Sequence, residues 1–545
     1  MTDVDFVIVG AGSAGCVLAD RLTASGRYSV MLLEAGGSDL NFWIWMPIGY
    51  GKAFYDPRIN WMYMSEPDPG TGGRRSYWPR GKVLGGSSSI NAMVYIRGQH
   101  QDFEDWKAMG NPGWGWDDVL PYFRKAETND AGADEWRGGD GPLHVATMAR
   151  DLHPLCQTYL KAGEELGLRR NPDFNGADQE GVGLYQNTAR NGFRMSTARA
   201  YLRPAMKRKN LRVVTHAHAT RILFQGSRAT GVEYICRGER RTVTAAREVI
   251  VSAGAVNSPQ LLQLSGIGPA HLLADKGVEV RHHLAGVGRN LQDHLGLDYL
   301  YRSRVPTLNQ QLRPLYGKLW YGLRYVLTRR GPLSLGVNQG GGFIRTRPEL
   351  TRPNMQLFFS PVSYTKAPPG KRPLMSPDPF PGFLLGIQPT RPTSRGYLEI
   401  RSSNPFEAPA IHPNYLSTNA DLQEMLEGAA FMRALAAMPA FQDVIDAEIK
   451  PGPDVTSTQD LVADIRSRAG TVFHPVGTCR MGPDRAHGVV DQRLRVHGVA
   501  GLRVVDASIF PTLTSGNTNA PAIMVGEKGA DMILADHATD GSPAR

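Results

Sequence analysis

The sequence predicts an α/β (α+β) protein with two lobes, and three features of the chain lead to this prediction. The 545 residues are too many for one hydrophobic core of ordinary size. Short runs of the strand type occur at 6–9, 249–251 and 503–505, far apart in the sequence, and the first two are continuously apolar. From about 296 to 470 the chain is instead rich in proline and strand-like pieces. We therefore expect a Rossmann-like lobe assembled from discontinuous segments, and a second lobe with a mainly antiparallel sheet and helices.

The N-terminal elements alternate between strand and helix. Residues 6–9 are continuously apolar, which predicts a parallel strand that is buried on both faces. A glycine turn follows at 10–15, and apolar residues then recur at helical spacing up to Leu22. A second strand is expected at 28–33, with Glu34 at its end. This order is that of a Rossmann-like unit.

The glycine turn carries the pattern of a dinucleotide-binding fingerprint. Gly10 permits the tight turn, Gly12 lets the backbone approach a pyrophosphate, and Gly15 lets the helix pack on the strand. The free N–H groups at the start of the helix would face the phosphates. Glu34, 19 residues past Gly15, can accept hydrogen bonds from both ribose hydroxyls, and its charge would repel the extra phosphate of NADP. The fingerprint alone leaves FAD and NAD open.

Later elements are predicted from turn residues and periodicity. Residues 41–64 show no period and predict a long ordered loop, and a second glycine cluster lies at 81–91. Residues 211–255 predict short strands, with a hairpin turn at 225–227 and a buried strand that runs into Gly254. Helices are expected near 422–437 and 523–534, and a strand at 503–505 ends at Asp506. Pro521 suits the first turn of the last helix.

Composition excludes several classes of protein. The net charge is +10, but the basic residues are scattered and form no nucleic-acid-binding module, so no nucleic acid partner is expected. No apolar run is long enough to cross a bilayer and no secretory signal is visible, so the expected location is cytoplasmic. Peripheral contact with the inner face of a membrane stays open. The four cysteines lack metal-ligand spacing, and we expect them to be reduced, with no metal site.

Several separated segments together resemble the glucose–methanol–choline (GMC) oxidoreductase family. They are the N-terminal fingerprint, residues 78–91, residues 254–268, and two C-terminal segments around His474 and Asn517. The resemblance covers essentially the whole chain, and within the family the sequence is most similar to the choline-dehydrogenase-like branch, which includes dehydrogenases of aliphatic alcohols. It implies FAD rather than NAD. Some members tether FAD through a histidine where this chain has Ile90, so non-covalent FAD is expected.

The resemblance also implies a division of the chain and a set of contacts to FAD. The Rossmann-like FAD-binding domain would comprise 1–150, 191–295 and 471–540, and the substrate domain would comprise 151–190 and 296–470. The residues expected to contact the cofactor are Gly10, Gly12, Ser13, Ala14, Gly15, Glu34, Ala35, Trp78, Arg80, Gly81, Val83, Gly85, Gly86, Ser89, Asn91, Ala92, Met93, Val94, Ala219, Ala253, Gly254, Asp506, Ala507, Asn517, Thr518 and Asn519.

His474 and Asn517 are the expected catalytic pair. Any one of 14 histidines is more often structural than catalytic, but the segment around His474 matches the family position that faces the flavin. An alcohol releases hydride readily only when a base takes its hydroxyl proton, and a neutral histidine suits that task. Asn517 can donate a hydrogen bond to the developing alkoxide. Hydride would then pass to flavin N5, and the positive end of the last helix would stabilise the reduced ring.

The substrate and the electron acceptor are less closely defined. Phe358 stands where some relatives have a histidine, which favours a primary, rather apolar alcohol and weakens a choline assignment. The aromatic residues of 41–64 form either a lid or ordinary packing between the lobes. A quinone-type acceptor is favoured, and an alcohol oxidase that uses oxygen is the main alternative. A flavoprotein without activity and an NAD-dependent dehydrogenase fit less well. The oligomeric state and the pathway are not indicated by the sequence.

Overall fold

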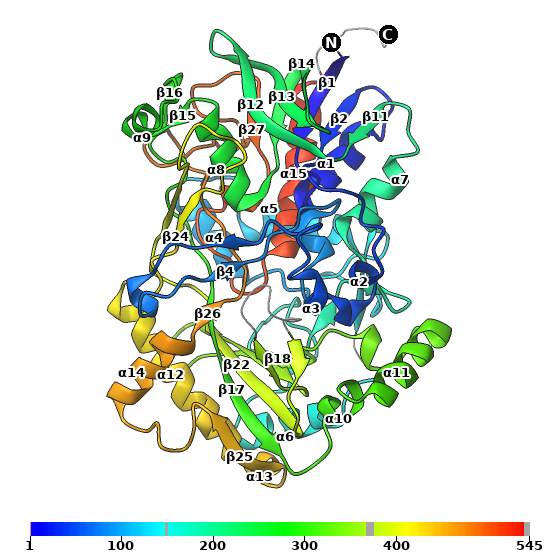
Figure 1. Ribbon diagram of the computed structural model, residues 1–545, viewed down its shortest axis with the longest axis vertical. Coiled ribbons are helices and arrows are strands. Elements are labelled where there is room, and N and C mark those ends of the chain that lie inside the picture. Colours follow the sequence, from blue (N-terminus) through cyan, green and yellow to red (C-terminus); the bar gives the residue numbers. More distant parts are fainter. Residues whose placement is uncertain (1, 148–150, 367–374, 539–545) are drawn as a thin grey trace.

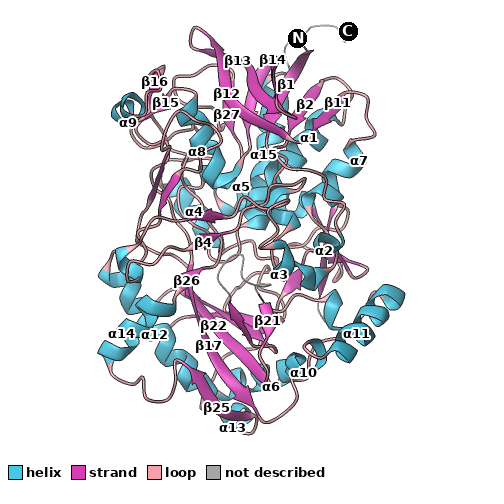
Figure 2. Ribbon diagram, in the orientation of Figure 1, coloured by secondary structure: helices cyan, strands magenta, loops and turns pink. Residues whose placement is uncertain are grey.

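The computed structural model describes residues 2–147, 151–366 and 375–538. It is elongated, with one lobe around the two chain ends and a second lobe at the opposite end of the long axis (Figure 1). Each lobe is built on its own seven-stranded sheet, and helices pack around both sheets (Figure 2).

The first sheet is assembled from segments far apart in the sequence. Its strand order is β11-β2-β1-β14-β13-β12, and β27 pairs with β14. Val7 of β1 (Thr2–Val9) pairs in parallel with Val249 of β14 (Glu239–Val251). Val251 pairs in parallel with Val504 of β27 (Leu502–Val504). β2 (Val30–Leu33) and β11 (Leu211–Val214) extend the parallel part. The predicted assembly of this lobe from discontinuous segments is confirmed.

An antiparallel hairpin completes the same sheet. β12 (Ala217–Gln225) and β13 (Arg228–Cys236) are joined through Gly226, whose φ is +58°. A glycine adopts this left-handed backbone without the steric cost of a Cβ atom. The hairpin predicted at 225–227 is therefore confirmed.

Two helices, α1 (Ser13–Thr23) and α15 (Asn519–Asp536), pack against each other on one face of the first sheet (Figure 1). Arg21 of α1 forms an ion pair with the buried Glu527 of α15, with 2.7 Å between Nη2 and Oε1. Tyr201 donates a further hydrogen bond to Glu527. The first and last long helices of the chain are thus joined beneath the glycine turn.

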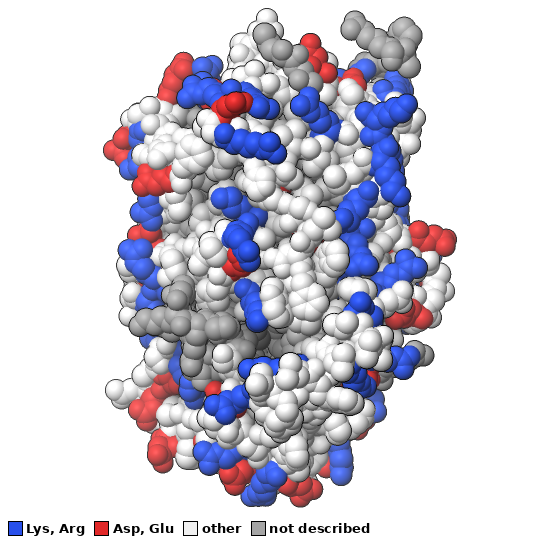
Figure 3. Space-filling model, turned by 45° about the vertical axis from the view of Figure 1, so that its right-hand side comes forward, with Lys and Arg blue, Asp and Glu red and all other residues white. Residues whose placement is uncertain are grey.

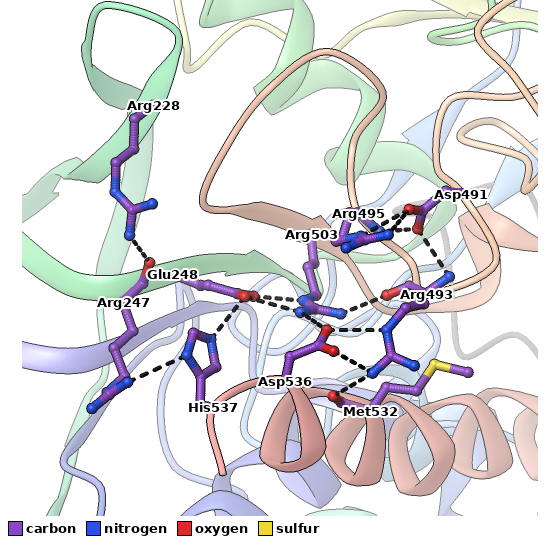
Figure 4. Close-up of polar contacts among 10 residues, drawn as sticks. All are labelled: Arg228, Arg247, Glu248, Asp491, Arg493, Arg495, Arg503, Met532, Asp536 and His537. Carbon is purple, nitrogen blue, oxygen red and sulfur yellow. Dashed lines mark hydrogen bonds and ion pairs between the residues drawn. The ribbon is translucent and has the colours of Figure 1, made fainter. Parts of the chain in front are cut away.

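The end of α15 is also joined to the sheet by an ion-pair network (Figure 4). Arg503 of β27 is almost completely buried and binds both carboxylate oxygens of Glu248 on β14. Arg503 also binds Asp536, which pairs with Arg493. His537 contacts the same Glu248 carboxylate. Burial alone would raise the pKa of Glu248. Its hydrogen bonds to His537 and Arg503 instead lower that pKa to about 2.

The second sheet is antiparallel, as predicted for the substrate lobe. Its order is β25-β17-β22-β19-β18-β7, and β26 pairs with the start of β17. The central strands are β17 (Leu295–Ser303), β22 (Gly382–Pro389) and β19 (Met355–Ser360). The outer ones are β18 (Gly340–Ile344), β7 (Gly181–Leu184), β25 (Ile445–Lys450) and β26 (Gly470–Thr471). Apolar side chains of α6 (Leu155–Glu165), α12 (Asn419–Ala436) and α13 (Pro439–Gln442) share one hydrophobic core with these strands.

The remaining described elements are short or lie between the lobes. The helices are α2 (Phe42–Trp45), α3 (Tyr50–Ala53), α4 (His100–Ala108), α5 (Trp116–Ala126), α7 (Arg203–Ala205), α8 (Gly254–Leu264), α9 (Ala270–Asp275), α10 (Leu308–Leu312), α11 (Leu315–Thr328) and α14 (Thr458–Arg468). The strands are β3 (Tyr63–Met64), β4 (Tyr77–Trp78), β5 (Glu127–Asn129), β6 (Leu143–Thr147), β8 (Gln186–Asn187), β9 (Ala189–Arg190), β10 (Phe193–Arg194), β15 (Ile267–Gly268), β16 (His282–His283), β20 (Tyr364–Lys366), β21 (Met375–Pro377), β23 (Tyr397–Glu399) and β24 (Ala410–His412).

Some predicted bounds differ from the structure. The segment 41–64 contains two helical turns, α2 and α3, because Asn41 caps the first turn by accepting a hydrogen bond from the Trp43 N–H. The last helix begins at Asn519, four residues before the expected start at 523, and Pro521 lies in its first turn, as expected. The four cysteines are buried and free, as expected. Among the described residues, no helix combines the length and the apolar character needed to span a bilayer.

Candidate active site

A cavity of about 660 Å³ lies where the two lobes meet. The carboxyl ends of β1, β14 and β27 meet at its upper side through Gly10, Ser252 and Asp506. Strands of the second sheet contribute Phe358, Leu384 and other residues. Its volume falls within the range of about 300–1,000 Å³ that is usual for small-molecule sites.

The N-terminal turn brings backbone close to this cavity. A Cβ atom on Gly10 (φ +100°) would lie 2.4 Å from the Ser252 carbonyl oxygen, and one on Gly15 would lie 2.0 Å from the Gly10 carbonyl oxygen. Gly86 of the second cluster approaches Gly12 so closely that its Cβ would lie 2.7 Å from the Gly12 Cα. No side chain caps the start of α1. Its free N–H groups therefore favour an anion at this end.

Glu34 is fixed at the edge of the cavity by the backbone. Its two carboxylate oxygens accept hydrogen bonds from the Ala11 N–H (2.9 Å) and the Gly36 N–H (2.8 Å). Burial raises the pKa of Glu34 to about 7. The carboxyl group lies beside the cavity and can accept further hydrogen bonds from hydroxyl groups of a ligand.

Five of the residues expected to contact a cofactor do not line the cavity, and the other predicted contacts do. Four of the five support the wall from behind. The Gly85 N–H donates to the Ala11 carbonyl, and the Ser89 hydroxyl donates to the Leu84 carbonyl. Val83 packs with Ile90, which does line the cavity. Gly15 acts through helix packing, as the fingerprint predicted. The fifth, Trp78, is buried in the hydrophobic core of the second sheet.

Asn91 is oriented by a buried arginine that the sequence did not indicate. Arg194 donates from Nη1 to the Asn91 side-chain oxygen over 2.7 Å, and its Nε donates to the Ile44 carbonyl. Burial lowers the pKa of Arg194 to about 9. The side-chain oxygen of Asn91 is thus engaged by Arg194. The side-chain NH2 group can donate a hydrogen bond to a ligand in the cavity.

His474 and Asn517 meet at the cavity, as expected from the sequence. The Asn517 Nδ2 lies 3.1 Å from the His474 Nε2, and both residues line the cavity. His474 follows β26, whereas Asn517 lies directly before α15. The pair is therefore formed where the end of the second sheet meets the start of the last helix.

The protonation of His474 follows from a second histidine, His294. The Nε2 of His294 contacts the Thr390 carbonyl oxygen at 2.9 Å, so this nitrogen carries the proton. The Nδ1 of neutral His294 then accepts from the Nδ1–H of His474 over 3.0 Å. This leaves the Nε2 of His474 without a proton, and Asn517 can donate to it. Burial, together with the neighbouring His294 and the charge of Arg80, holds the pKa of His474 well below its usual value.

Asp293 and Arg80 hold the backbone around His474. The Asp293 carboxylate accepts from the His474 N–H (2.7 Å) and from the hydroxyls of Thr471 and Tyr415. Arg80 donates to the Phe473 carbonyl over 2.6 Å. Phe473 itself has a φ of +72°. This strained backbone is therefore held on both sides, which fixes the direction of the imidazole ring.

Gln356 orients the Asn517 side chain. Gln388 donates to the Gln356 side-chain oxygen (2.8 Å), and Gln356 donates to the Asn517 side-chain oxygen (3.4 Å). The Asn517 oxygen is therefore engaged, and its NH2 group faces His474. The sequence analysis did not single out Asp293, His294 or Gln356. The Gln-Asp-His run at 292–294 was the available signal, because polar residues directly before a buried strand are seldom core residues.

Asp506 lines the cavity and also caps a short helical turn. Its carboxylate accepts from the Ser508 N–H at the start of a single 3₁₀ turn, from the Gly254 N–H, and from the Ser258 hydroxyl. These three bonds join the end of β27 to the start of α8, where Ala253 and Gly254 line the cavity.

The part of the cavity next to His474 is lined by aromatic side chains. They are Tyr50, Phe54, Tyr55, Phe358, Tyr364 and Phe473. Of the aromatic loop at 41–64, Tyr50, Phe54, Tyr55 and Trp61 line the cavity, whereas Trp43 and Trp45 do not. The loop therefore contributes both a wall of the cavity and packing beneath it.

Comparison with known proteins identifies the family of this chain. A family model described as GMC oxidoreductase matches residues 4–296, and a second model of the same description matches residues 392–526. The chain belongs to the GMC oxidoreductase family. An alcohol dehydrogenase [acceptor] from Pseudomonas putida is 45% identical over 97% of this chain and 95% of its own length. An oxygen-dependent choline dehydrogenase from Vibrio vulnificus (strain YJ016) is 44% identical over 97% of this chain and 94% of its own length. Pyridoxine 4-oxidase from Mesorbium loti superposes with a TM-score of 0.87 at 32% identity, covering 97% and 99% of the two chains.

Membership of this family confirms the prediction of an FAD-dependent oxidoreductase. The residues present fit the cofactor. The close approaches at Gly10 and Gly86 leave no room for a Cβ, the uncapped start of α1 suits a pyrophosphate, and the Glu34 carboxylate suits a ribose. Ile90 lines the cavity and has no atom that could bond to a flavin, in agreement with non-covalent FAD.

Proposed function

We propose that this GMC oxidoreductase oxidises a primary, rather apolar alcohol to the aldehyde and passes the electrons to a quinone-type acceptor. The unprotonated Nε2 of His474, held at the cavity between His294 and Asn517, is the observation that supports this proposal most strongly. A base placed in this way presents an unprotonated nitrogen, which can exchange the hydrogen bond from Asn517 for the hydroxyl proton of a substrate.

The residues of this chain divide the reaction between them. His474 accepts the hydroxyl proton at Nε2, and the imidazolium that forms keeps its other proton on Nδ1, where His294 accepts it. Asn517 donates from Nδ2 to the oxygen that becomes an alkoxide, because Gln356 holds its side-chain oxygen. When bound, FAD supplies the acceptor for the hydride that leaves the alcohol carbon. The aromatic wall excludes water from the reacting atoms.

The aromatic residues beside His474 favour an apolar substrate. Phe358, Tyr364 and Phe54 present ring surfaces, and burial of a methylene group against such surfaces contributes about 0.8 kcal/mol. Affinity is therefore expected to rise with alkyl chain length until the cavity is full. The alcohol dehydrogenase relative from Pseudomonas putida has the same class of activity in its name.

A cationic alcohol such as choline is the second candidate. Asp298 and Phe358 both line the cavity, and the Asp298 carboxylate lies beside Gly386, where a Cβ atom would be 2.8 Å from its Oδ1. A carboxylate together with aromatic faces can hold a quaternary ammonium group. The choline dehydrogenase relatives from Vibrio vulnificus and mouse support this alternative.

An anaerobic stopped-flow measurement of flavin bleaching tests the proposal. We expect fast bleaching with 1-butanol to 1-octanol and slower bleaching with choline, polyols and aryl alcohols. Reoxidation by a water-soluble quinone should then be faster than reoxidation by oxygen. Fast bleaching by choline alone would favour the second candidate, and fast reoxidation by oxygen with release of hydrogen peroxide would favour an alcohol oxidase. A flavin that no alcohol bleaches would contradict both.

The proposed location follows from the proposed acceptor. Quinones of respiratory chains reside in membranes, so we propose a cytoplasmic enzyme that contacts the inner face of a membrane. The net charge of +10 supports this contact, because cytoplasmic membrane surfaces are negatively charged. Fractionation of cells into membrane and soluble extracts, with and without a high-salt wash, tests this location.

A further inference from the structure

α11 (Leu315–Thr328) is an amphipathic helix whose apolar side faces solvent. Seven of the 14 large apolar side chains that are exposed in the described part of the chain belong to this helix. Leu315, Trp320 and Leu327 are 73%, 62% and 73% exposed. The other four are Tyr316, Leu319, Leu323 and Val326. At 100° per residue all seven fall within one stripe of the helix surface.

The opposite side of α11 attaches the helix to the protein. Gly317 and Tyr325 are buried, and the Tyr325 hydroxyl donates to the Gly192 carbonyl over 2.9 Å. Gly317 packs so closely on α10 (Leu308–Leu312) that a Cβ would lie 2.0 Å from the Gln311 carbonyl oxygen. Arg324 pairs with Asp151. The exposed stripe therefore belongs to a helix that is firmly attached, and burial in the core of this chain does not account for it.

Basic residues surround the stripe. No Asp or Glu occurs in residues 299–348, whereas nine Arg or Lys residues do. Arg313, Lys318 and Arg330 are exposed on or beside α11. Lys52 of α3 is also exposed, and the charge of Lys318 helps to lower its pKa, so the two ammonium groups lie near each other. On the face shown in Figure 3, basic side chains border a broad uncharged surface in the lower half of the molecule.

We propose that α11 docks this protein on an anionic lipid bilayer, with the stripe of 315–327 in the headgroup layer and the surrounding cations on lipid phosphates. Leu, Trp and Tyr opposite a basic side are typical of helices that lie in the membrane interface. At about 1.5 Å per residue the helix is about 21 Å long, too short to cross a hydrocarbon core of about 30 Å. A second copy of the chain fits less well, because a two-fold contact would oppose these cations to one another.

The docking helix is connected to the cavity. Leu308 and Leu312 of α10 belong to one hydrophobic cluster with Tyr50, Phe54 and Phe473, which line the cavity. A bilayer bound at α11 would therefore lie near the aromatic side of the site. The inference assigns the proposed membrane contact to α11. It rests on the proposed function only where it assumes that the electron acceptor is a quinone in the bilayer.

Sedimentation with vesicles tests the proposal on the holoenzyme. Wild-type protein should bind vesicles of phosphatidylglycerol and phosphatidylcholine, and bind pure phosphatidylcholine vesicles much less. Added NaCl should weaken the binding, because it screens the lipid charge. The double variant L319E/L323E should bind the anionic vesicles at least about ten-fold more weakly.

A matched variant separates the stripe from added charge. M109E/V280E places two carboxylates at exposed apolar residues elsewhere, 49% and 41% exposed, and should bind vesicles nearly as the wild type does. Both double variants should keep flavin bleaching by alcohol and turnover with a soluble dye. Only L319E/L323E should lose turnover with a quinone embedded in anionic vesicles.

Three results would overturn the proposal. The first is wild-type protein that does not bind anionic vesicles. The second is L319E/L323E that binds them as tightly as the wild type does. The third is a dimer of the wild type without lipid that becomes a monomer in L319E/L323E. The last result would assign the stripe to self-association. Because vesicle binding needs no turnover, failure of the bleaching assay would not affect this test.

Discussion

His474 lies between two side chains that determine which of its nitrogens carries a proton. His294 takes the Nδ1–H of His474 only because the Thr390 carbonyl occupies its other nitrogen. Asn517 presents its NH2 group only because Gln356 binds its oxygen. The unprotonated Nε2 of His474 is thus set by a backbone carbonyl, an amide and the neutral His294, whose pKa burial lowers to about 4. None of these groups changes charge near neutral pH.

Replacement of His474 by alanine tests its proposed role as the base. We expect His474→Ala to slow flavin reduction by alcohol about 10²- to 10⁴-fold, the usual contribution of a positioned base. Stopped-flow bleaching measures this rate. The flavin absorption spectrum is the control, since it should show undiminished FAD binding. Reduction at the wild-type rate would eliminate His474 as the base.

The pH dependence of the reaction tests the role of His294 as a positioning residue. Because the pKa of His474 is held well below its usual value, the base stays unprotonated as the pH falls through about 6.5. The acid limb of kcat/KM is therefore expected below that pH. His294→Ala removes the acceptor of the Nδ1–H, which should lower the rate. It also removes the second imidazole, which competes with His474 for a proton and lowers its pKa, so the limb should move upward. His294→Asn, which keeps an acceptor oxygen, should restore part of the rate. An unmoved limb would argue against this role.

Ile90 is the residue that decides how the flavin is attached. Acid precipitation should leave a colourless pellet and a yellow supernatant, because Ile90 offers no nucleophile or imidazole to the cofactor. Absorbance of the two fractions measures the distribution. Flavin that stays with the pellet would mean that another residue forms a covalent bond.

At the scale of single elements, strands and turns could be predicted more closely than loops. The continuous apolar runs at 6–9 and 249–251 and the glycine of the 225–227 turn fix local backbone by themselves. The helical turns within 41–64 could not be predicted, because Trp45, Ile44 and Ala53 fold onto Val83 and Ile90 from another segment. Long-range packing, rather than periodicity, determines those turns.

The joint between α15 and the sheet gives a prediction about stability. Glu248→Gln removes one of the two carboxylates that pair with the buried Arg503 and leaves Asp536 as the other. This change is expected to cost about 1.5–3 kcal/mol of the free energy of unfolding. Urea denaturation measures this loss. Glu279→Gln is the matched control, because its pair with Arg281 is exposed and should contribute at most about 1 kcal/mol.

The same carboxylate has a defined dependence on pH. The pKa of Glu248 is about 2 in the folded protein, against an unfolded value of about 4.3. Its stabilising contribution is therefore complete above about pH 4.3 and is lost as the pH falls toward 2. The difference in stability between wild type and Glu248→Gln should shrink over that interval, and a constant difference would contradict the assignment.

At the scale of the whole molecule, the two lobes contribute different parts of the site. The glycine turns, Glu34, His474 and Asn517 could be found from the sequence, since each stands in a distinctive local pattern. Asp293 and His294 have only a weak local signal, the polar run at 292–294, and Gln356 has none. Their roles arise only where strands of the second sheet contact His474 and Asn517. A polar residue in a buried strand has no local mark that separates structural from positioning roles.

The order of strands in the first sheet bears on how the protein is made. β1 is complete within the first ten residues, yet its neighbour β14 must itself pair with β27, where Val251 meets Val504. At roughly 5–20 residues per second, a ribosome needs on the order of 13–50 s to pass from Val251 to Val504. During this interval the edge of β14 that will pair with β27 is unpaired and exposed on the nascent chain. We therefore expect newly made chains to be held by chaperones until β27 leaves the exit tunnel.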